Sequence, residues 1–227
     1  DRRQNNSVQY WTPNLGGFQA KFGYGANEEK PVKDITPPIV NPDPKMWSGS
    51  LAYDNGRLYA AFAYERHDDY LSPTLFGAGA TGSEDRGWEI GAGYWIVPQF
   101  RIVAAFENLE YESEFAGGTQ RLDRDAWMIG GLYKSGPWSL GINYVKAKDY
   151  DVNAAATAAG VLENGTGARF WTLRGGYSLS KRTELFAHYA NLRNDANNNY
   201  AFGHSPLAGA ANGTDPKGFG VGIKHSF

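Results

Sequence analysis

The residue types that most often carry covalent catalysis or metal binding are sparse in this chain. Its 227 residues include four histidines and no cysteine, which excludes thiolate metal sites and disulfide bridges. His67 precedes two aspartates at the edge of a polar segment, a pattern more typical of a solvated turn than of a metal site. His188 follows Glu184 by four residues, and no serine stands at a spacing that fits a hydrolase. We therefore predict that the chain is not an enzyme and uses no metal ion or cofactor.

Phosphate and nucleic-acid binding are also poorly supported. The Gly-rich segment 77–82 lacks the Lys-Ser or Lys-Thr ending and the following helix of a phosphate-binding loop, so it indicates a surface loop. The formal net charge of −2 gives no overall basic footprint for nucleic acid. We predict no nucleic-acid partner.

The remaining candidates are charged side chains that share one face of predicted strands. Their chemistry would be electrostatic, because cationic groups along a narrow water-filled lumen raise the local concentration of anions. Each residue could equally be a solvated wall residue, and a register slip of one residue would move it to the opposite face. We predict as pore-lining basic residues Lys21, Arg57, Arg101, Arg174 and Lys224, and as pore-lining acidic residues Glu65, Glu89, Glu107 and Glu184.

The elements that would position these charges are indicated by an aromatic repeat. Five of the seven tryptophans are followed six residues later by a tyrosine. Six is even, so a β-strand places both rings on one face, whereas a helix would separate them by about 120°. The positions between the rings on that face are apolar or Gly. The pairs, which we predict to form an aromatic girdle, are Trp47 and Tyr53, Trp88 and Tyr94, Trp127 and Tyr133, Trp138 and Tyr144, and Trp171 and Tyr177.

Two aromatic levels that bound an apolar band are typical of a strand that crosses a bilayer. A soluble barrel or sandwich would turn the same apolar face inward, and periodicity alone does not decide between them. The position of the rings at the strand ends favours the membrane, since Trp and Tyr prefer its interfaces. A helical membrane protein is excluded, because no apolar run approaches the roughly 20 residues that a spanning helix needs.

Alternating apolar positions and turn residues predict one domain, 1–227, with eleven strands. The connections alternate between short turns, such as Asn55-Gly56, and long polar segments at 26–45, 68–86, 112–123, 149–167 and 194–215. One end of the sheet therefore has tight turns and the other has long loops. The strands are predicted at 6–12, 17–25, 46–54, 57–67, 87–96, 99–111, 124–134, 137–148, 168–179, 183–193 and 216–227.

Eleven strands do not fit the even number that single-chain bacterial barrels usually have. The chain starts close to its first strand and ends with its last one. We expect the further strands on the N-terminal side.

Three segments resemble the general diffusion porins of β-proteobacteria and their relatives. The end, 218–227, alternates small or polar with apolar residues and finishes on Phe227, as in the C-terminal strand of Gram-negative outer-membrane proteins. Segment 3–10, continuing to Phe18, resembles the strand after the constriction loop of these porins, and 177–183 resembles their penultimate hairpin. The matches occur in the family's order and cover both ends of the chain.

The resemblance implies an all-β protein, a 16-stranded transmembrane antiparallel β-barrel to which this chain supplies strands 6 to 16. It also implies a homotrimer in the outer membrane of a Gram-negative bacterium, in contact with lipid and lipopolysaccharide. Arg3 matches a family arginine on the pore wall, and Phe227 would be the signal read by the barrel assembly machinery. The acidic constriction loop of such porins is not part of this sequence.

The leading functional interpretation is a porin for passive diffusion of small anions and hydrophilic solutes, with mild anion selectivity. A soluble β-barrel or lectin-like binding module is the alternative, and an outer-membrane barrel enzyme is a third. Extraction discriminates the first two, since a porin requires detergent.

Overall fold

The computed structural model describes residues 6–26, 43–70, 79–202 and 211–226, and they form one antiparallel sheet with a short helix. Twelve strands make up the sheet within these ranges. No helix of the described part is long and apolar enough to cross a membrane. The strands are β1 (Ser7–Trp11), β2 (Phe18–Ala26), β3 (Lys45–Asp54), β4 (Leu58–Asp68), β5 (Gly82–Val97), β6 (Phe100–Phe115), β7 (Gly118–Ser135), β8 (Trp138–Ala147), β9 (Asp151–Val152), β10 (Ala168–Ser178), β11 (Thr183–Asn194) and β12 (Lys217–His225), and the helix is α2 (Ala154–Ala158).

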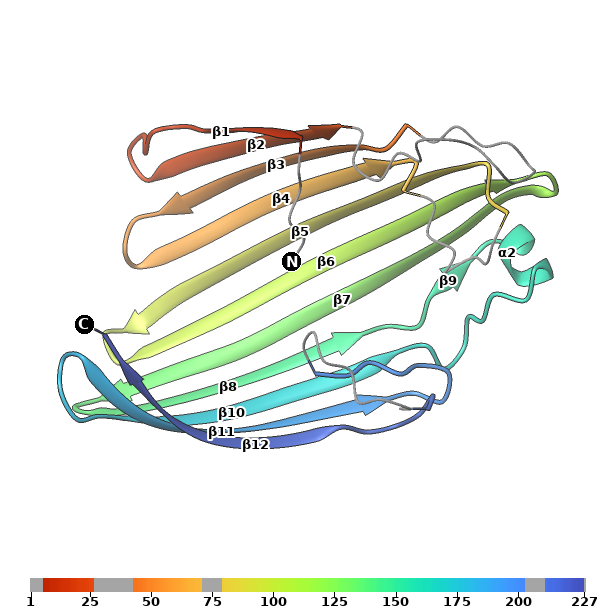
Figure 1. The fold of residues 1–227 in the computed structure, drawn as a ribbon. Helices are drawn as coiled ribbons and strands as arrows, with labels where there is room; N and C mark the ends of the chain where they lie inside the picture. The colour runs from red at the N-terminus through yellow and green to blue at the C-terminus, as the bar shows by residue number, and fades with distance from the viewer. Residues whose placement is uncertain (1–5, 27–42, 71–78, 203–210, 227) are drawn as a thin grey trace.

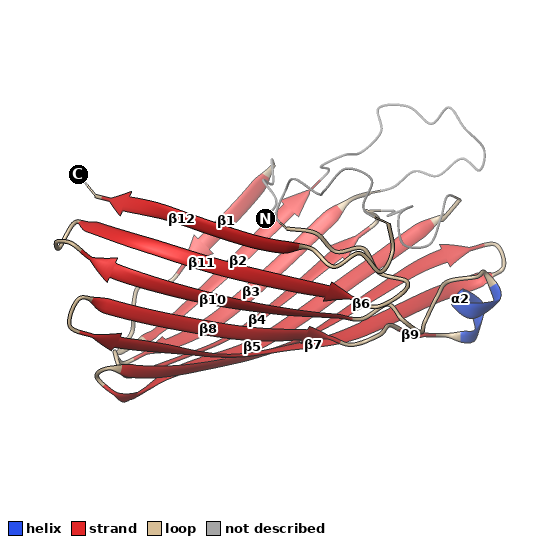
Figure 2. Ribbon diagram, turned by 90° about the horizontal axis from the view of Figure 1, so that it is seen from below, coloured by secondary structure: helices blue, strands red, loops and turns tan. Residues whose placement is uncertain are grey.

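The strands form a meander in which each long strand pairs with the next along the chain. The order is β1 to β8 and then β10 to β12, while the two-residue β9 pairs with β7 outside this path. The sheet is curved, so that β1–β4 and β10–β12 bend toward the same side and form a trough (Figures 1 and 2). The eleven predicted strands are confirmed, with ends that differ by a few residues at most positions.

The predicted asymmetry of the connections holds at one end of the sheet and has one exception at the other. The five short turns fall where expected, at 12–17, 55–57, 98–99, 136–137 and 179–182. The predicted loop at 112–123 is wrong, because β6 and β7 continue to a tight turn at Ala116-Gly117. This segment is rich in charge and has few apolar residues, which resembles a loop, but ion pairs across the two strands, such as Arg121 to Glu110 at 3.2 Å, hold it as a hairpin.

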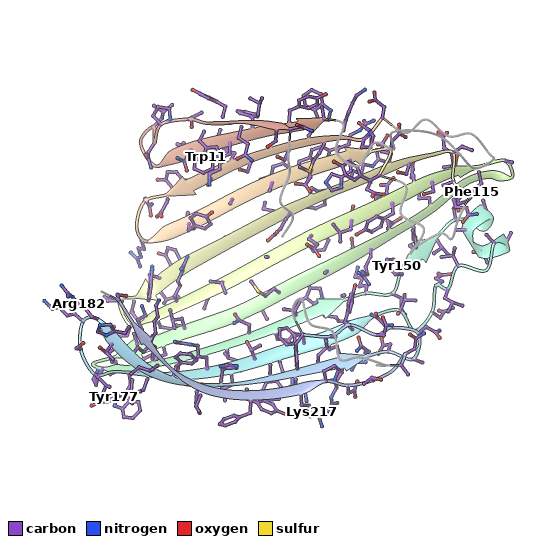
Figure 3. All side chains as sticks on the ribbon, in the orientation of Figure 1. Trp11, Phe115, Tyr150, Tyr177, Arg182 and Lys217 are labelled. Carbon is purple, nitrogen blue, oxygen red and sulfur yellow. The ribbon has the colours of Figure 1, made fainter. Side chains whose placement is uncertain are left out.

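The apolar face of the sheet points away from the trough and is exposed. Tyr177 projects from this convex side (Figure 3), and Trp47, Trp88 and Trp138 are 52%, 37% and 63% exposed. The buried apolar side chains of the described part are only Leu122, Ala156, Ala168 and Leu192. A soluble barrel would bury its ring-bearing face as a core. The exposed apolar face therefore favours a lipid environment.

Gly17 gives a test of the fold at the turn between β1 and β2. Its φ is +98°, and a Cβ atom there would lie 2.7 Å from the carbonyl oxygen of Asp54. We expect Gly17→Ala to lower the free energy of unfolding by about 1–3 kcal/mol, because both backbone strain and a close contact oppose it. The measurement is the denaturant midpoint of the folded protein in detergent.

Gly117→Ala is the matched control, because nothing lies within 4 Å of its added Cβ and its φ is not positive. An equal loss of stability in both variants would contradict the explanation by strain.

Candidate functional site: the inner face of the sheet

The inner face is the face opposite the aromatic girdle, and the strand register defines it. Directly opposed residues of neighbouring antiparallel strands share a face. Lys21 opposes Ser50, which opposes Ala63, and this row continues through Glu89 to Glu107. Two small side chains thus separate a cation on β2 from a pair of carboxylates on β5 and β6.

The pair of carboxylates is a distinctive feature of this face. Glu89 and Glu107 stand directly opposite each other on neighbouring strands, an arrangement that is unfavourable for like charges in a sheet. Glu65 lies on the same face of β4, with its carboxylate 2.7 Å from His67 Nε2. Together with Lys21 and Trp11 these groups line a hollow of about 590 Å³.

Four of the predicted basic residues lie in three places on the inner face. Lys21 stands over the ring of Trp11 at 5.0 Å, and Arg101 stands over the ring of Trp95 at 5.8 Å. Arg174 forms an ion pair of 3.1 Å with Glu184. Lys224 lies directly opposite Glu184 on β12, so this carboxylate has a cation on each side. The structure therefore neutralises part of the predicted positive charge.

Arg57 does not lie where the sequence predicted it. It belongs to the turn between β3 and β4, and its Nε donates a hydrogen bond of 3.1 Å to the carbonyl oxygen of Trp95. Its guanidinium group lies 5.0 Å from the ring centre of Tyr94, a member of the outer aromatic girdle. The side chain is at the rim of the sheet rather than on the wall, because the carbonyl oxygens at the end of β5 and the ring offer partners there.

Arg124 on β7 is the most enclosed charge of the inner face. Its side chain lies between the rings of Tyr150 and Tyr200, 4.3 and 5.2 Å from their centres, and the whole residue is 8% exposed. It also donates a hydrogen bond to the Tyr200 hydroxyl group. Burial raises the pKa of Tyr200 above its ordinary value. Tyr150 follows β8 and Tyr200 follows β11, so one arginine joins two connections to the wall.

Asparagine side chains join the same two connections to each other and to the strands. Asn198 Nδ2 donates to the carbonyl oxygens of Thr166 and Gly167 at 2.7 and 3.1 Å. Asn194 Nδ2 donates to the carbonyl oxygen of Tyr200 at 2.9 Å. Phe202 approaches Phe170 on the inner face of β10, with their ring centres 6.1 Å apart. The segment around Tyr200 and Phe202 therefore lies over the inner face of the sheet.

A charged inner face, an exposed apolar outer face and rings at the ends of the apolar band occur together in this sheet. The family model described as "Gram-negative porin" matches residues 1–197. The chain belongs to the Gram-negative porin family. Its fold is that of a transmembrane antiparallel β-barrel, and its location is the outer membrane of Gram-negative bacteria, as the resemblance implied.

Related proteins agree with this assignment. The porin chain is 31% identical over 229 residues to outer membrane porin protein 32 of Delftia acidovorans, covering 99% of this chain and 57% of that protein. Among solved structures, it resembles an anion-selective porin from Comamonas acidovorans, with a TM-score of 0.71, 26% identity and coverage of 99% of this chain and 60% of that one. OmpT of Vibrio cholerae in its trimer form has the same fold, with a TM-score of 0.67, 16% identity and coverage of 98% and 64%. The porin chain thus spans somewhat more than half the length of these relatives.

Sequence reasoning missed four charged residues on the inner face of the porin. Asp85 opposes His67, Arg124 opposes Leu109, and Lys134 opposes Ser139, while Asp54 opposes Tyr59. All four stand at or beyond the ends of the predicted strands. The even spacing that places Glu89 and Met128 on this face, extended by a few residues, would have found them.

Two predicted residues lie outside the described part of the porin. They are Arg3, expected on the pore wall, and Phe227, expected as the assembly signal. Within the described residues, no group of three or more His, Cys, Asp or Glu side chains could hold a metal ion.

Proposed function

We propose that this chain forms a single domain, 1–227, that is the larger part of the wall of a 16-stranded porin. The complete protein lets small hydrophilic solutes and ions diffuse passively through a water-filled lumen. The observation that carries the proposal is the contrast between the two faces of the sheet. The convex face exposes aliphatic and aromatic side chains, whereas the concave face carries charges of both signs. A wall of this kind separates lipid from water.

Mild anion selectivity is the second part of the proposal. Among the predicted inner-face cations that the structure describes, Lys21 and Arg101 lie against aromatic rings, and Arg174 shares Glu184 with Lys224. Carboxylates on β4–β6 offset much of this charge, so we expect only a weak preference. The related structure described as anion-selective supports the sign.

The proposed partners follow from the family and the outer face. They are two further copies of the complete porin, which would form a homotrimer with it, and outer-membrane lipid with lipopolysaccharide. The barrel assembly machinery, which would read Phe227, is a further partner. A trimer form is named for one structure of the same fold. Small anions and hydrophilic solutes are the proposed cargo.

We propose no enzymatic activity and no cofactor. His188, which follows Glu184 by four residues in the sequence, stacks on Phe186 with ring centres 6.1 Å apart. The soluble binding module is disfavoured, because its core would have to be the face that is exposed here.

The deciding experiment is the reversal potential of the purified full-length porin in a planar bilayer under a KCl gradient. We expect stepwise conductance and a potential of the anion-selective sign. Cation selectivity would contradict the proposed anion selectivity but would not contradict the proposed channel. Absence of conductance from protein that is folded in the bilayer would contradict the channel itself.

A further inference from the structure

The aromatic girdle gives a scale for the height of each inner-face charge on the wall. In β3, β5, β7 and β10 the girdle tryptophan lies toward the long connections, which we call the loop end. The girdle tyrosine of the same strands lies toward the short turns, which we call the turn end. Six residues separate the two levels, which is about 20 Å along a strand and about 15 Å in height at the usual tilt. Counting from the nearest ring therefore places each charge.

The carboxylates of β4–β6 on the inner face lie at or beyond the loop-end level. They are Glu65, Asp85, Glu89 and Glu107. Glu89 follows Trp88 by one residue, and Glu107 lies directly opposite Glu89. Asp85 stands three residues beyond Trp88 toward the loop end. Arg124 is the one cation that the described strands place on the inner face at this level, and tyrosine rings enclose it. This part of the wall is the acidic zone.

The cations of the inner face lie between the middle of the wall and the turn-end level. They are Lys21, Arg101, Lys134, Arg174 and Lys224. Arg101 opposes Trp95, which is one residue past the turn-end ring of β5. Lys21 opposes Ser50, midway between the two rings of β3, and Arg174 is midway between those of β10. This part of the wall is the basic zone.

Two carboxylates of the described strands also belong to the basic zone, and both are engaged. Glu184 lies between Arg174, at 3.1 Å, and Lys224 on the neighbouring strand. Asp54 accepts a hydrogen bond of 2.7 Å from the backbone N–H of Gly56 in the turn. Five cations against two carboxylates leave the basic zone with a positive surplus.

The charges that define the two zones are not neutralised by their neighbours. Within the described part of the chain, Glu89, Glu107, Arg101 and Lys134 form no ion pair. Arg101 and Lys134 both stand over the ring of Trp95, each 5.8 Å from its centre. A ring orients a cation but leaves its net charge in place. Each zone therefore keeps a field of its own sign in the lumen.

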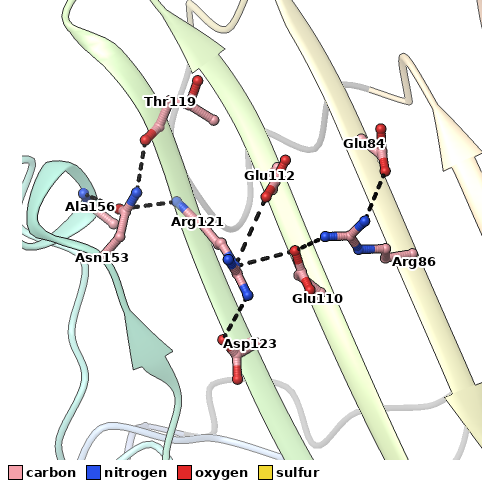
Figure 4. A network of polar contacts seen from close by, with 9 residues as sticks. All are labelled: Glu84, Arg86, Glu110, Glu112, Thr119, Arg121, Asp123, Asn153 and Ala156. Carbon is pink, nitrogen blue, oxygen red and sulfur yellow. Dashed lines mark hydrogen bonds and ion pairs between the residues drawn. The ribbon is translucent and has the colours of Figure 1, made fainter.

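The outer face of the same strands differs, because its charges are paired across the strands. Glu110 accepts from Arg86 and from Arg121, whose Nε lies 3.2 Å away (Figure 4). Arg121 also lies 3.7 Å from Asp123. These groups point away from the lumen, so charge removal on this face gives a matched control.

Two zones of opposite sign in series make the passage of ions depend on direction. The acidic zone enriches cations and the basic zone enriches anions. A positive potential at the loop end drives cations in through the acidic zone and anions in through the basic zone, so both accumulate between the zones and the current rises. The opposite potential draws both kinds of ion out of the lumen, and the current falls.

We propose that the complete porin rectifies, carrying more ionic current when its loop end is at the positive potential than when it is at the negative potential. The separation of the acidic zone from the basic zone along the wall is the cause. This inference rests on the proposed function, because it takes the inner face to be the wall of a conducting lumen.

The test records single channels of the full-length porin in a planar bilayer with the same dilute KCl solution on both sides, at about pH 8, where carboxylates are ionised. We expect the currents at opposite potentials of about 100 mV to differ roughly 1.5- to 2-fold near 0.01 M salt, where the Debye length is about 30 Å. At 1 M salt the Debye length is about 3 Å, and the ratio should approach one.

Two double variants and two controls assign the effect to the zones. E89Q/E107Q weakens the acidic zone and R101Q/K134Q weakens the basic zone, so each should move the current ratio toward one. E84Q/E112Q and K146Q/R169Q remove the same charges from the outer face and should keep the ratio of the unchanged protein. If a double variant does not fold, E107Q or K134Q alone replaces it, with a smaller change expected.

A second measurement on the same channel checks the direction. The reversal potential is recorded under a KCl gradient and again with the gradient inverted. Anion selectivity should be weaker when the dilute solution faces the loop end, because the acidic zone is then the less screened one. The chamber in which dilution weakens anion selectivity must be the chamber whose positive potential gives the larger current.

A current ratio of one in dilute KCl would overturn the inference, as would a ratio that both inner-face variants leave unchanged. Disagreement between the two measurements about the chamber would also overturn it. A porin that conducts equally in both directions contradicts only this inference. Absence of conductance contradicts the proposed channel, and the inference with it.

Discussion

Replacing Glu89 and Glu107 together by glutamine is expected to raise the ratio of anion to cation permeability at least about threefold. A unit charge about 7 Å from an ion in an aqueous lumen changes its energy by about 0.6 kcal/mol, a factor of about three. The two carboxylates oppose each other on the inner face, so an ion that passes this part of the wall meets both. The measurement is the reversal potential of the E89Q/E107Q variant under a KCl gradient, at low ionic strength where screening is weakest.

The matched control is E84Q/E112Q, which removes the same two charges from the outer face of the same two strands. We expect its permeability ratio to stay close to that of the unchanged protein. An equal shift in both variants would show that overall charge matters and the position of the carboxylates does not. An unchanged permeability ratio in E89Q/E107Q would show that ions do not pass close to this part of the wall.

Arg124→Ala is expected to lower the free energy of unfolding by roughly 2–4 kcal/mol. The variant loses two contacts with tyrosine rings and a hydrogen bond to the Tyr200 hydroxyl group. It also releases the segment around Tyr200 from the wall, so chymotrypsin should cut after Tyr200 or Phe202 faster than in the unchanged protein. The denaturant midpoint and the cleavage rate in detergent are the two measurements.

Lys148→Gln controls for loss of a positive charge near the same strand. Its ammonium group forms an exposed ion pair of 2.8 Å with Asp125 on β7, a type of contact that contributes at most about 1 kcal/mol. If Arg124→Ala were no more destabilising than Lys148→Gln, the enclosed guanidinium group would not hold the two connections. Unchanged cleavage after Tyr200 would lead to the same conclusion.

The sheet could be predicted from the sequence because its signal is local. The spacing of six between Trp and Tyr, and turns such as Asn55-Gly56, are properties of short segments, and they gave the right strands and the right faces. The prediction failed at 112–123, where Arg121 and Glu110 stabilise strands that have little apolar character. Such a pairing joins residues of two different strands, and alternation along one strand does not reveal it.

The site was less predictable than the sheet for the same reason. The faces of Lys21, Glu89 and Glu107 follow from alternation, but the partners of these residues do not. Arg57 turns to Tyr94 at the rim, and Arg124 is enclosed by rings from connections that come 26 and 76 residues later. Side chains at strand ends have several partners within reach, so their direction depends on the folded loops.

In the proposed porin, the length of the β6–β7 hairpin would give the mouth of the pore a rim of unequal height. β5, β6 and β7 have 16, 16 and 18 residues, whereas β10 has 11. Five to seven additional residues extend a strand by about 20 Å. In that porin, a solute that approaches from the side of β7 would meet a taller charged wall than one that approaches from the side of β10. Capture from the surrounding water should therefore depend on direction, and large particles that settle on the cell surface should touch the hairpin before the opening.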